Sequence, residues 1–344
     1  MKTFNIENKY GSSSIYVGER LKNLENFLPD CHTIIITDEN IKKYYQKEFP
    51  DMPVITIGNG EKIKQLATVE TILKKLIHLS CDRSSFIVGI GGGIVCDIAG
   101  FAASVFLRGV NFGFVSTSLL SQVDASVGGK NGVNLNSYKN MVGVFNQPKF
   151  VICDLDLLST LPQKEISNGF AEIVKHALIS DSNLFSFIEK NVQKALSLDY
   201  ETIFTLVSES VKIKSRVVQK DEKESNERRL LNFGHTIGHA IEKTEKKGHG
   251  SAVARGMVAA AKFSQARHMI NQTDVSRICS LLTDLNLPIA LEYNAQKIIR
   301  AARKDKKKQG SELFYVFLER IGKATVEKIS FDELNTFIAS VFQK

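Results

Sequence analysis

The apolar segment at residues 86–107, FIVGIGGGIVCDIAGFAASVFL, constrains the fold of this chain more than any other feature of the sequence. It is long enough to suggest a membrane span, but Asp97 and a glycine triplet interrupt it, and Arg83 and Arg108 bound it. A buried strand that runs through a glycine turn into a helix explains this pattern better. The segment therefore predicts one strand–turn–helix unit of a larger sheet.

The same alternation of strand and helix runs through the first half of the chain. The apolar runs CHTIIITDEN, MPVITIG, SSFIVGIGGG, FGFVSTS and KFVICDLDLLSTLP are predicted to be strands, and their spacing is typical of a parallel sheet. After Pro162 most segments instead repeat apolar residues every 3.6 positions, as in EISNGFAEIVKHALI. A chain of 344 residues favours two domains. We expect an α/β domain over residues 1–161 and a mainly helical domain over residues 162–344.

Composition narrows the classes of molecule that the protein is expected to bind and the cellular compartment in which it is expected to work. With 43% hydrophobic and 24% charged residues, the chain is expected to be soluble and globular. Its formal charge of +8 favours anionic small molecules and does not indicate nucleic acid. The five cysteines are scattered and never in CxxC spacing, which predicts reduced thiols in a cytoplasm. The first residues, MKTFNIENKYG, contain no apolar signal core.

Polar and glycine residues follow several of the predicted strands. The glycine triplet is not a literal GxGxxG and not a Walker loop, but it would let backbone N–H groups approach a diphosphate. Open α/β sheets bind ligands where their parallel strands end. Each group alone is more simply turn chemistry, whereas the set predicts a dinucleotide. Its members are Gly92, Gly93, Asp38, Asn40, the NGEKIK segment at residues 59–64, Thr117 and Ser118.

A histidine cluster in the second half predicts a metal site. In RRLLNFGHTIGHAIE, His235 and His239 are four residues apart and share one helical face, and His249 follows in GHGSAV. No Glu lies between the first two, so the HExxH metalloprotease motif is absent. Glu172, in the apolar stretch GFAEIVKHA, is a candidate carboxylate ligand, although a surface pair with Lys175 is the simpler alternative. One carboxylate and two imidazoles suit catalytic zinc or cobalt.

Cations and amides accompany both predicted sites. A site with this many cations predicts a substrate that carries phosphate, carboxylate or both. The run Lys306-Lys307-Lys308 is by default a solvated loop. The charged and amide candidates are Arg108, Asp124, Lys130, Lys139, Asn140, Lys175, Lys214, Arg228 and Asn232.

These motifs together resemble the 3-dehydroquinate synthase family. The resemblance covers GGGIVCDIAGF, LRGV, VSTSLLSQVDASVGGKNGVN, KNMVGVFNQP, LSTLP, NGFAEIVKHALI, RRLLNFGHTIGHAIE and HGSAVARGM, in order, from about residue 38 to about residue 323. It implies an α/β Rossmann-like N-terminal domain followed by a mainly α-helical metal-binding domain. It also implies a shikimate-pathway lyase that uses NAD and a divalent metal, zinc or cobalt. Such an enzyme converts 3-deoxy-arabino-heptulosonate 7-phosphate to 3-dehydroquinate and phosphate by transient oxidation, phosphate elimination, re-reduction and aldol cyclisation.

The resemblance also implies roles for individual residues. The metal ligands would be Glu172, His235 and His249, and His239 would be the acid/base residue. NAD would contact Asp38, Asn40, Asn59, Gly60, Glu61, Lys64, Gly92, Gly93, Asp97, Thr117, Ser118, Asp124, Lys130, Lys139, Leu157 and Thr160. The substrate set would be Arg108, Asp124, Lys130, Asn140, Lys175, Lys214, Arg228 and Asn232, with one lysine of the DKKK run at residues 305–308.

Two positions depart from the family pattern. Ser251 stands where Glu is usual, and Ser118 stands where Thr is usual. Because of Ser251, a different activity is an alternative: that of another sugar-phosphate cyclase, which would act on glucose 6-phosphate or sedoheptulose 7-phosphate. A metal-dependent polyol dehydrogenase is a second alternative, although its neutral substrates would not need so many cations. The family further suggests a homodimer. The modest charge and the interrupted apolar run predict that the protein binds neither nucleic acid nor membrane.

Overall fold

A computed structural model describes residues 1–8, 11–136, 138–245, 248–306 and 312–342. The chain divides into two compact units, each built from two stretches of sequence. The first comprises Met1–Ile166 and Ile203–Glu222, and the second comprises Ser167–Thr202 and Lys223–Lys344. The predicted division at residue 161 remains a prediction about domain roles, since by contact alone residues 203–222 group with the first unit.

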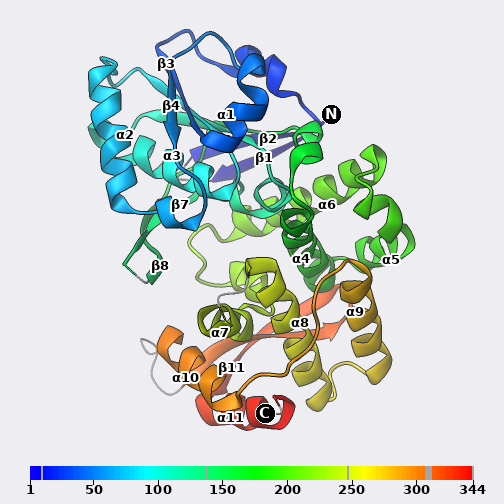
Figure 1. Ribbon diagram of the computed structural model, residues 1–344. Coiled ribbons are helices and arrows are strands. Elements are labelled where there is room, and N and C mark those ends of the chain that lie inside the picture. Colours follow the sequence, from blue (N-terminus) through cyan, green and yellow to red (C-terminus); the bar gives the residue numbers. More distant parts are fainter. Residues whose placement is uncertain (9–10, 137, 246–247, 307–311, 343–344) are drawn as a thin grey trace. The chain divides into compact units, whose positions relative to one another are not determined.

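The first unit contains a seven-stranded sheet in the described part of the chain (Figure 1). The spatial order is β1-β2-β9-β6-β5-β3-β4, and only the β1–β2 pair is antiparallel. Their bounds are β1 Lys2–Asn8, β2 Gly11–Val17, β3 Thr33–Asp38, β4 Val54–Ile57, β5 Phe86–Gly91, β6 Asn111–Ser116 and β9 Phe150–Cys153. The five strands predicted from apolar runs are confirmed, whereas β1 and β2 were not predicted.

Burial explains why the central strands contain few polar residues. All six residues of β5 are buried, because a parallel strand between two neighbours is covered on both faces. The α-helices described wholly within this unit are α1 Glu39–Tyr45, α2 Leu66–His78 and α3 Gly93–Val105. In α3 eight of the thirteen residues are buried, which accounts for the long apolar run in the sequence. The predicted strand–glycine–helix unit is therefore β5–Gly92–α3.

A hairpin extends this unit beyond the predicted elements. A π-helical turn at Ser121–Ala125 leads into β7 Lys130–Leu135, which pairs antiparallel with β8 Tyr138–Phe145. The side of β7 that carries Asn131 and Val133 is buried, and β7 packs on α3. The sequence SQVDASVGGKNGVN supplies the charged candidates Asp124 and Lys130, but the sequence analysis did not predict a strand in it.

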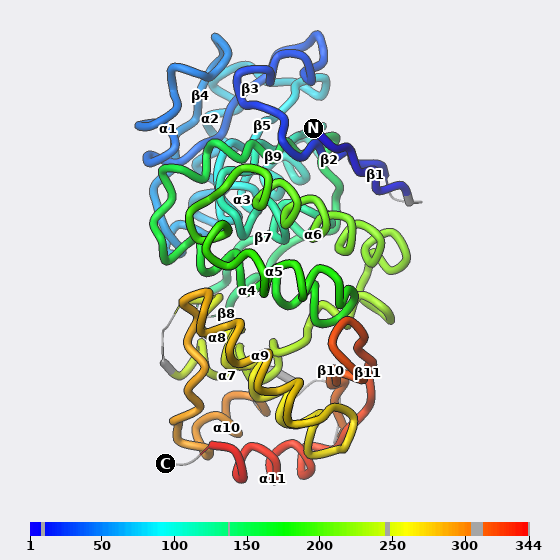
Figure 2. The backbone as a smooth tube through the Cα atoms, turned by 90° about the vertical axis from the view of Figure 1, so that its right-hand side faces the viewer, coloured from blue at the N-terminus to red at the C-terminus, as the bar shows by residue number. Residues whose placement is uncertain are grey.

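The second unit is mainly helical. Its helices include α5 Ser182–Leu196, α7 His235–Glu245, α8 His249–Ala266, α9 Gln272–Asp284, α10 Ala295–Lys306 and α11 Phe331–Val341. Two long helices, α4 Gln163–Ser180 and α6 Tyr200–Lys220, contribute residues to both units. A hairpin of β10 Glu312–Arg320 and β11 Lys323–Ser330 lies beside α11 (Figures 1 and 2).

The predicted fold class is confirmed by this architecture: a parallel α/β unit and a mostly helical unit. None of the described helices has both the length and the apolar character needed to cross a membrane. This agrees with the assignment of residues 86–107 to β5, α3 and the short turn that follows α3.

Candidate active site

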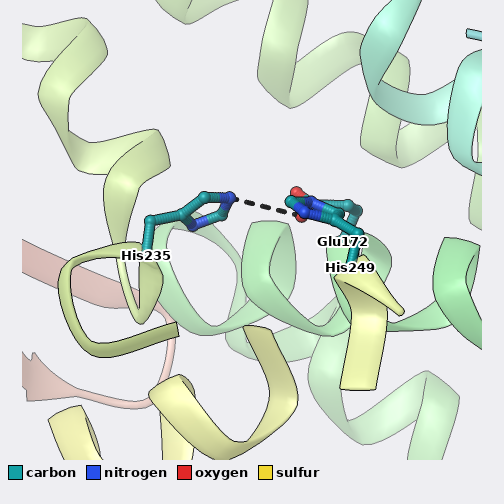
Figure 3. A group of neighbouring side chains, drawn as sticks. All are labelled: Glu172, His235 and His249. Atoms are coloured by element: carbon teal, nitrogen blue, oxygen red, sulfur yellow. Dashed lines mark ion pairs between the residues drawn. The ribbon is translucent and has the colours of Figure 1, made fainter. Parts of the chain in front are cut away.

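Three side chains of the second unit converge on one point. Glu172 lies in α4, His235 begins α7 and His249 begins α8. One ligand atom from each lies within 4.8 Å of the others, and Figure 3 shows the three side chains pointing toward one another. Glu172 is fully buried. The predicted alternative of a surface Glu172–Lys175 pair is wrong, because Lys175 contacts the Glu172 carboxylate and is itself only 2% exposed.

Glycines allow the two histidine helices to approach closely. A Cβ built on Gly256 of α8 would lie 2.0 Å from the carbonyl oxygen of Gly234 and 2.8 Å from the backbone nitrogen of Gly238. Gly234 precedes α7 and has φ +76°, a conformation that favours glycine. The glycines of NFGHTIGH and ARGM thus set the separation of α7 and α8, and with it the separation of His235 from His249.

The contacts around the ligand atoms fix the imidazole orientations. His235 Nδ1 lies 3.1 Å from the carbonyl oxygen of Phe233, which directs Nε2 toward Glu172, 3.6 Å from Oε1. His249 Nε2 lies 3.4 Å from the same oxygen, and its Nδ1 faces the Glu242 carboxylate at 3.7 Å. Groups that hold the second ring nitrogen orient an imidazole for metal binding. Glu242 was missed by the sequence analysis, although it stands seven residues after His235 on the same helical face.

The protonation states of Glu172 and His235 suit a cation, whereas His249 would have to lose a proton on binding one. Burial alone would raise the pKa of Glu172, but the Lys175 ammonium and the two imidazoles hold that pKa well below its usual range. Burial, together with the charge of Lys175, lowers the pKa of His235 well below its usual value. For His249, burial opposes protonation, yet Glu172 and Glu242 raise the pKa to about 9. An ionised carboxylate and a neutral imidazole are the forms in which these groups bind metals, and a cation would displace the proton on His249.

His239 lies one turn beyond His235 but outside the group of three. Its ring centroid is 5.2 Å from that of His235 and 6.5 Å from that of His249. Of the two histidines of GHTIGH, the structure therefore places only His235 in the group of three. His239 lies beside the cluster, and its role as the acid/base residue remains a prediction.

Arg228 and Asn232 lie in the short 3₁₀ helix Glu227–Asn232 that leads into α7. Arg228 is 2% exposed, and Asn232 Nδ2 donates to Glu224 Oε1. Glu224 has φ +59°, an uncommon conformation for a residue with a side chain. The sequence analysis missed Glu224, because a single acidic residue in the charged stretch DEKESNERR carries no distinguishing signal.

The groups predicted to bind a dinucleotide lie at one edge of the sheet in the first unit. Asp38 pairs in register with Ile57, and Gly91 pairs with Ser116, which in turn pairs with Cys153. The strands therefore end level with one another. The residues that follow them lie along the carboxyl edge, where open α/β sheets bind nucleotides. These residues are Asp38, Asn40, Asn59, Gly60, Gly92, Gly93, Thr117, Ser118, Leu157 and Thr160.

Two features of this edge suit a diphosphate. Gly92 caps α3 without a side-chain hydrogen bond, so the first N–H groups of that helix can meet an anion. A Cβ on Gly92 would lie 3.2 Å from the Ser118 hydroxyl, and one on Gly93 would lie 2.9 Å from the Ala125 Cβ. These glycines thus keep the turn close to its neighbours as well as open to a ligand. Asp38 caps α1 by accepting from Ile41 N at 2.9 Å, and burial raises its pKa.

Charged members of the first unit form two connected groups. Lys64, only 6% exposed, contacts the Asp97 carboxylate and donates to Asn140 Oδ1 at 2.6 Å. Lys214 of α6 contacts Asp124 through both the side-chain and the main-chain oxygen. The structure thus joins Lys64, Asp97 and Asn140 in one group. It joins Lys214 and Asp124 in a second group. All five are predicted binding residues.

The remaining predicted residues of this unit lie on turns and on the hairpin. Arg108 is exposed and has φ +69°, and Asn140 has φ +51°. Lys130 and Lys139 are exposed on β7 and β8. Lys307 and Lys308 lie outside the described residues, and so does Lys247, where a turn was expected before His249.

Fold and cluster together define a class: a protein with a parallel nucleotide-type sheet and a helical unit that carries one carboxylate and two imidazoles. Models of the 3-dehydroquinate synthase N-terminal and C-terminal domains match residues 54–168 and 169–308. The chain belongs to the 3-dehydroquinate synthase family. The resemblance found in the motifs is thereby confirmed.

Relatives extend the match over most of the chain. A 3-dehydroquinate synthase from Ruminiclostridium cellulolyticum is 38% identical and covers 91% of this chain and 90% of its own length. One from Acetivibrio thermocellus is 42% identical over 84% of each chain. A solved 2-deoxy-scyllo-inosose synthase in complex with carbaglucose-6-phosphate, NAD⁺ and Co²⁺ is 28% identical, with a TM-score of 0.87 over 99% of this chain and 100% of that one. A probable glycerol dehydrogenase from Sinorhizobium meliloti, 12% identical with a TM-score of 0.66 over 97% of this chain and 98% of that one, shares the fold alone.

Proposed function

We propose that this chain converts 3-deoxy-arabino-heptulosonate 7-phosphate to 3-dehydroquinate and phosphate, a step of the shikimate pathway. The observation that carries the proposal is the convergence of Glu172, His235 and His249 within 4.8 Å in a chain of this family. The relatives that cover most of its length are 3-dehydroquinate synthases. The reaction class is carbon–oxygen lyase.

The cluster fits a divalent metal. Glu172, His235 and His249 would hold it, because an ionised carboxylate and two oriented imidazoles leave a further position open for substrate oxygen. Zinc and cobalt both suit this donor set. When bound, such a metal would supply Lewis acidity toward substrate hydroxyl groups. Glu242 and the Phe233 carbonyl would keep the two imidazoles in position.

The sheet edge fits NAD. The uncapped start of α3 suits the diphosphate, and the polar residues after β3 and β4 suit ribose hydroxyls. NAD would supply a reversible hydride acceptor, so that it is not consumed. The solved 2-deoxy-scyllo-inosose synthase carries NAD⁺ and Co²⁺, and this supports the same pair of cofactors here.

The chain's own residues would bind the substrate and move its protons. We assign Lys130, Lys175 and Arg228 to the phosphate and carboxylate of the substrate, because fixed cations hold such groups through successive steps. His239, beside the cluster, would exchange a proton near the phosphate-bearing carbon. We assign substrate contacts also to Arg108, Asp124, Asn140, Lys214 and Asn232.

A related sugar-phosphate cyclase activity is the second candidate. The structural likeness to 2-deoxy-scyllo-inosose synthase, which was solved with carbaglucose-6-phosphate, favours it. Ser251 also favours it, because its hydroxyl accepts from Arg255 of α8 where the family usually has a carboxylate. Activity on glucose 6-phosphate or sedoheptulose 7-phosphate that exceeds activity on the heptulosonate phosphate would establish this candidate.

Domain roles, assembly and location complete the proposal. Residues 1–161 would bind NAD and residues 162–344 the metal. We propose a homodimer, supported by exposed apolar side chains on β7 and β8, among them Tyr138 at 63% exposed, Met141 and Phe145. A cytoplasmic location is supported by five free cysteines.

One assay tests the proposed reaction. The purified protein with Zn²⁺ or Co²⁺ is given the heptulosonate phosphate, with and without NAD, while phosphate and NADH are followed. We expect phosphate release that requires NAD, produces no net NADH and stops on chelation. Stoichiometric NADH production would instead indicate a dehydrogenase.

A further inference from the structure

Asn134, on β7, has no role in the sequence analysis, yet it contacts both predicted binding segments of the first unit. Its backbone N–H donates to the carbonyl of Lys64 at 2.8 Å. Its side-chain Nδ2 donates to Glu61 Oε1 at 2.7 Å, and its Oδ1 accepts from the backbone N–H of Asn140 at 2.8 Å. A carboxamide is suited to this place because it donates and accepts at the same time.

Asn140 is held at both its backbone and its side chain. It has φ +51°, a left-handed conformation that costs free energy for a residue with a Cβ. Asn134 holds its N–H, and Lys64 donates to its Oδ1 at 2.6 Å. Because both partners are tied to residues 61–64, the conformation of Asn140 depends on the position of that segment.

The hydrogen bonds form one continuous chain of contacts. It runs from Glu61 through Asn134 to Asn140, then through Lys64 to Asp97 on α3. On the proposed function, Glu61, Lys64 and Asp97 bind NAD and Asn140 binds the sugar phosphate. Asn134 is the member with no ligand of its own.

We propose that Asn134 is a positioning residue that couples NAD binding at residues 59–64 to the orientation of Asn140 for substrate. The inference rests on the proposed function. NAD orders the segment that contains Glu61 and Lys64, and Asn134 transmits that order to the strained backbone of Asn140. Substrate binding tightens NAD binding in return, since coupling between two sites is reciprocal.

Two substitutions test the Nδ2 donor and the Oδ1 acceptor of the Asn134 carboxamide separately. Asn134→Ala removes both side-chain hydrogen bonds. Asn134→Asp keeps an acceptor for the Asn140 N–H but loses the donor to Glu61 and places two carboxylates together. Asn136→Gly is the matched control. It lies in the same hairpin at φ +53°, which glycine adopts freely.

The measurements are the Kd of NAD with and without 3-dehydroquinate, KM and kcat for the heptulosonate phosphate at saturating NAD, and thermal unfolding. We expect Asn134→Ala to raise KM about tenfold. In this variant 3-dehydroquinate should no longer lower the Kd of NAD, so the ratio of the Kd values without and with it should be about one. Asn134→Asp should weaken NAD while keeping KM near wild type. Asn136→Gly should change neither quantity.

The outcomes distinguish this inference from the proposed function. If wild-type protein binds no NAD, the proposed function fails and the coupling has no basis. If wild type binds NAD but Asn134→Ala keeps the wild-type KM and coupling, the positioning role is wrong. If Asn134→Ala only loses stability, the result for Asn134→Asp decides. A KM and an NAD affinity in Asn134→Asp that both equal those of wild type would overturn the proposal.

Discussion

The close crossing of α7 and α8 makes a prediction that joins packing to metal binding. Changing Gly256 to Ala places a Cβ 2.0 Å from the Gly234 carbonyl oxygen, whereas ordinary contact begins at 3.4 Å. The obstructing atoms are backbone, so no side chain can rotate away. The two helices must therefore separate by about 1.4 Å along that direction.

The separation affects both stability and the ligand geometry. Overpacking costs about 1–3 kcal/mol, and the better helix propensity of Ala offsets about 1 kcal/mol of this. His235 begins α7 and His249 begins α8, while metal–ligand distances tolerate only about 0.2 Å. We therefore expect the Zn²⁺ affinity of Gly256→Ala to fall by at least about 10–100-fold, the range seen when groups that orient ligands are lost.

The assay titrates Zn²⁺ into metal-free protein against a competing chelator and follows thermal unfolding with and without Zn²⁺. Binding to the native state alone raises the unfolding temperature, so the Zn²⁺-dependent rise should shrink in the variant. Lys262→Ala, at an exposed position of the same helix, is the control and should behave as wild type. Wild-type Zn²⁺ affinity and stability in Gly256→Ala would refute the argument that this crossing positions the histidines.

Three further substitutions test the cluster by direct measurement. His235→Ala should abolish Zn²⁺ binding while the far-ultraviolet circular dichroism stays that of wild type; retained binding would exclude it as a ligand. His239→Ala should bind Zn²⁺ normally but release phosphate more slowly, by about 10²–10⁴-fold for a lost acid/base group; an unchanged rate would remove its assigned role. Glu242→Gln should lower Zn²⁺ affinity by about 10–100-fold, because Glu242 faces His249 Nδ1, and calorimetry that finds equal affinity would contradict this orienting role.

Local patterns predicted the elements that depend on local periodicity. The buried runs that became β3, β5 and β6 are continuous apolar segments, and the glycine triplet marks the start of α3. The strands β1, β2, β7, β8, β10 and β11 were not predicted, although β10 contains the apolar run at residues 313–318. In β7 the three buried residues are Asn131, Gly132 and Val133, and β8 has no buried residue, so neither strand shows a regular apolar pattern in the sequence. The β10–β11 hairpin lies in a half of the chain where helical periodicity dominates.

For the cluster, the sequence by itself determined the residue types and the helical spacing of His235 and His239, because four residues make about one turn whatever surrounds them. Only the tertiary structure decided that Glu172, more than sixty residues earlier, meets His235 and His249, since this depends on glycine contacts between α7 and α8 and on the packing of α4. The same holds for Asn134, whose role arises from hydrogen bonds to segments distant in sequence. Spacing along one helix is a local property of the backbone, whereas convergence of side chains is a result of long-range packing.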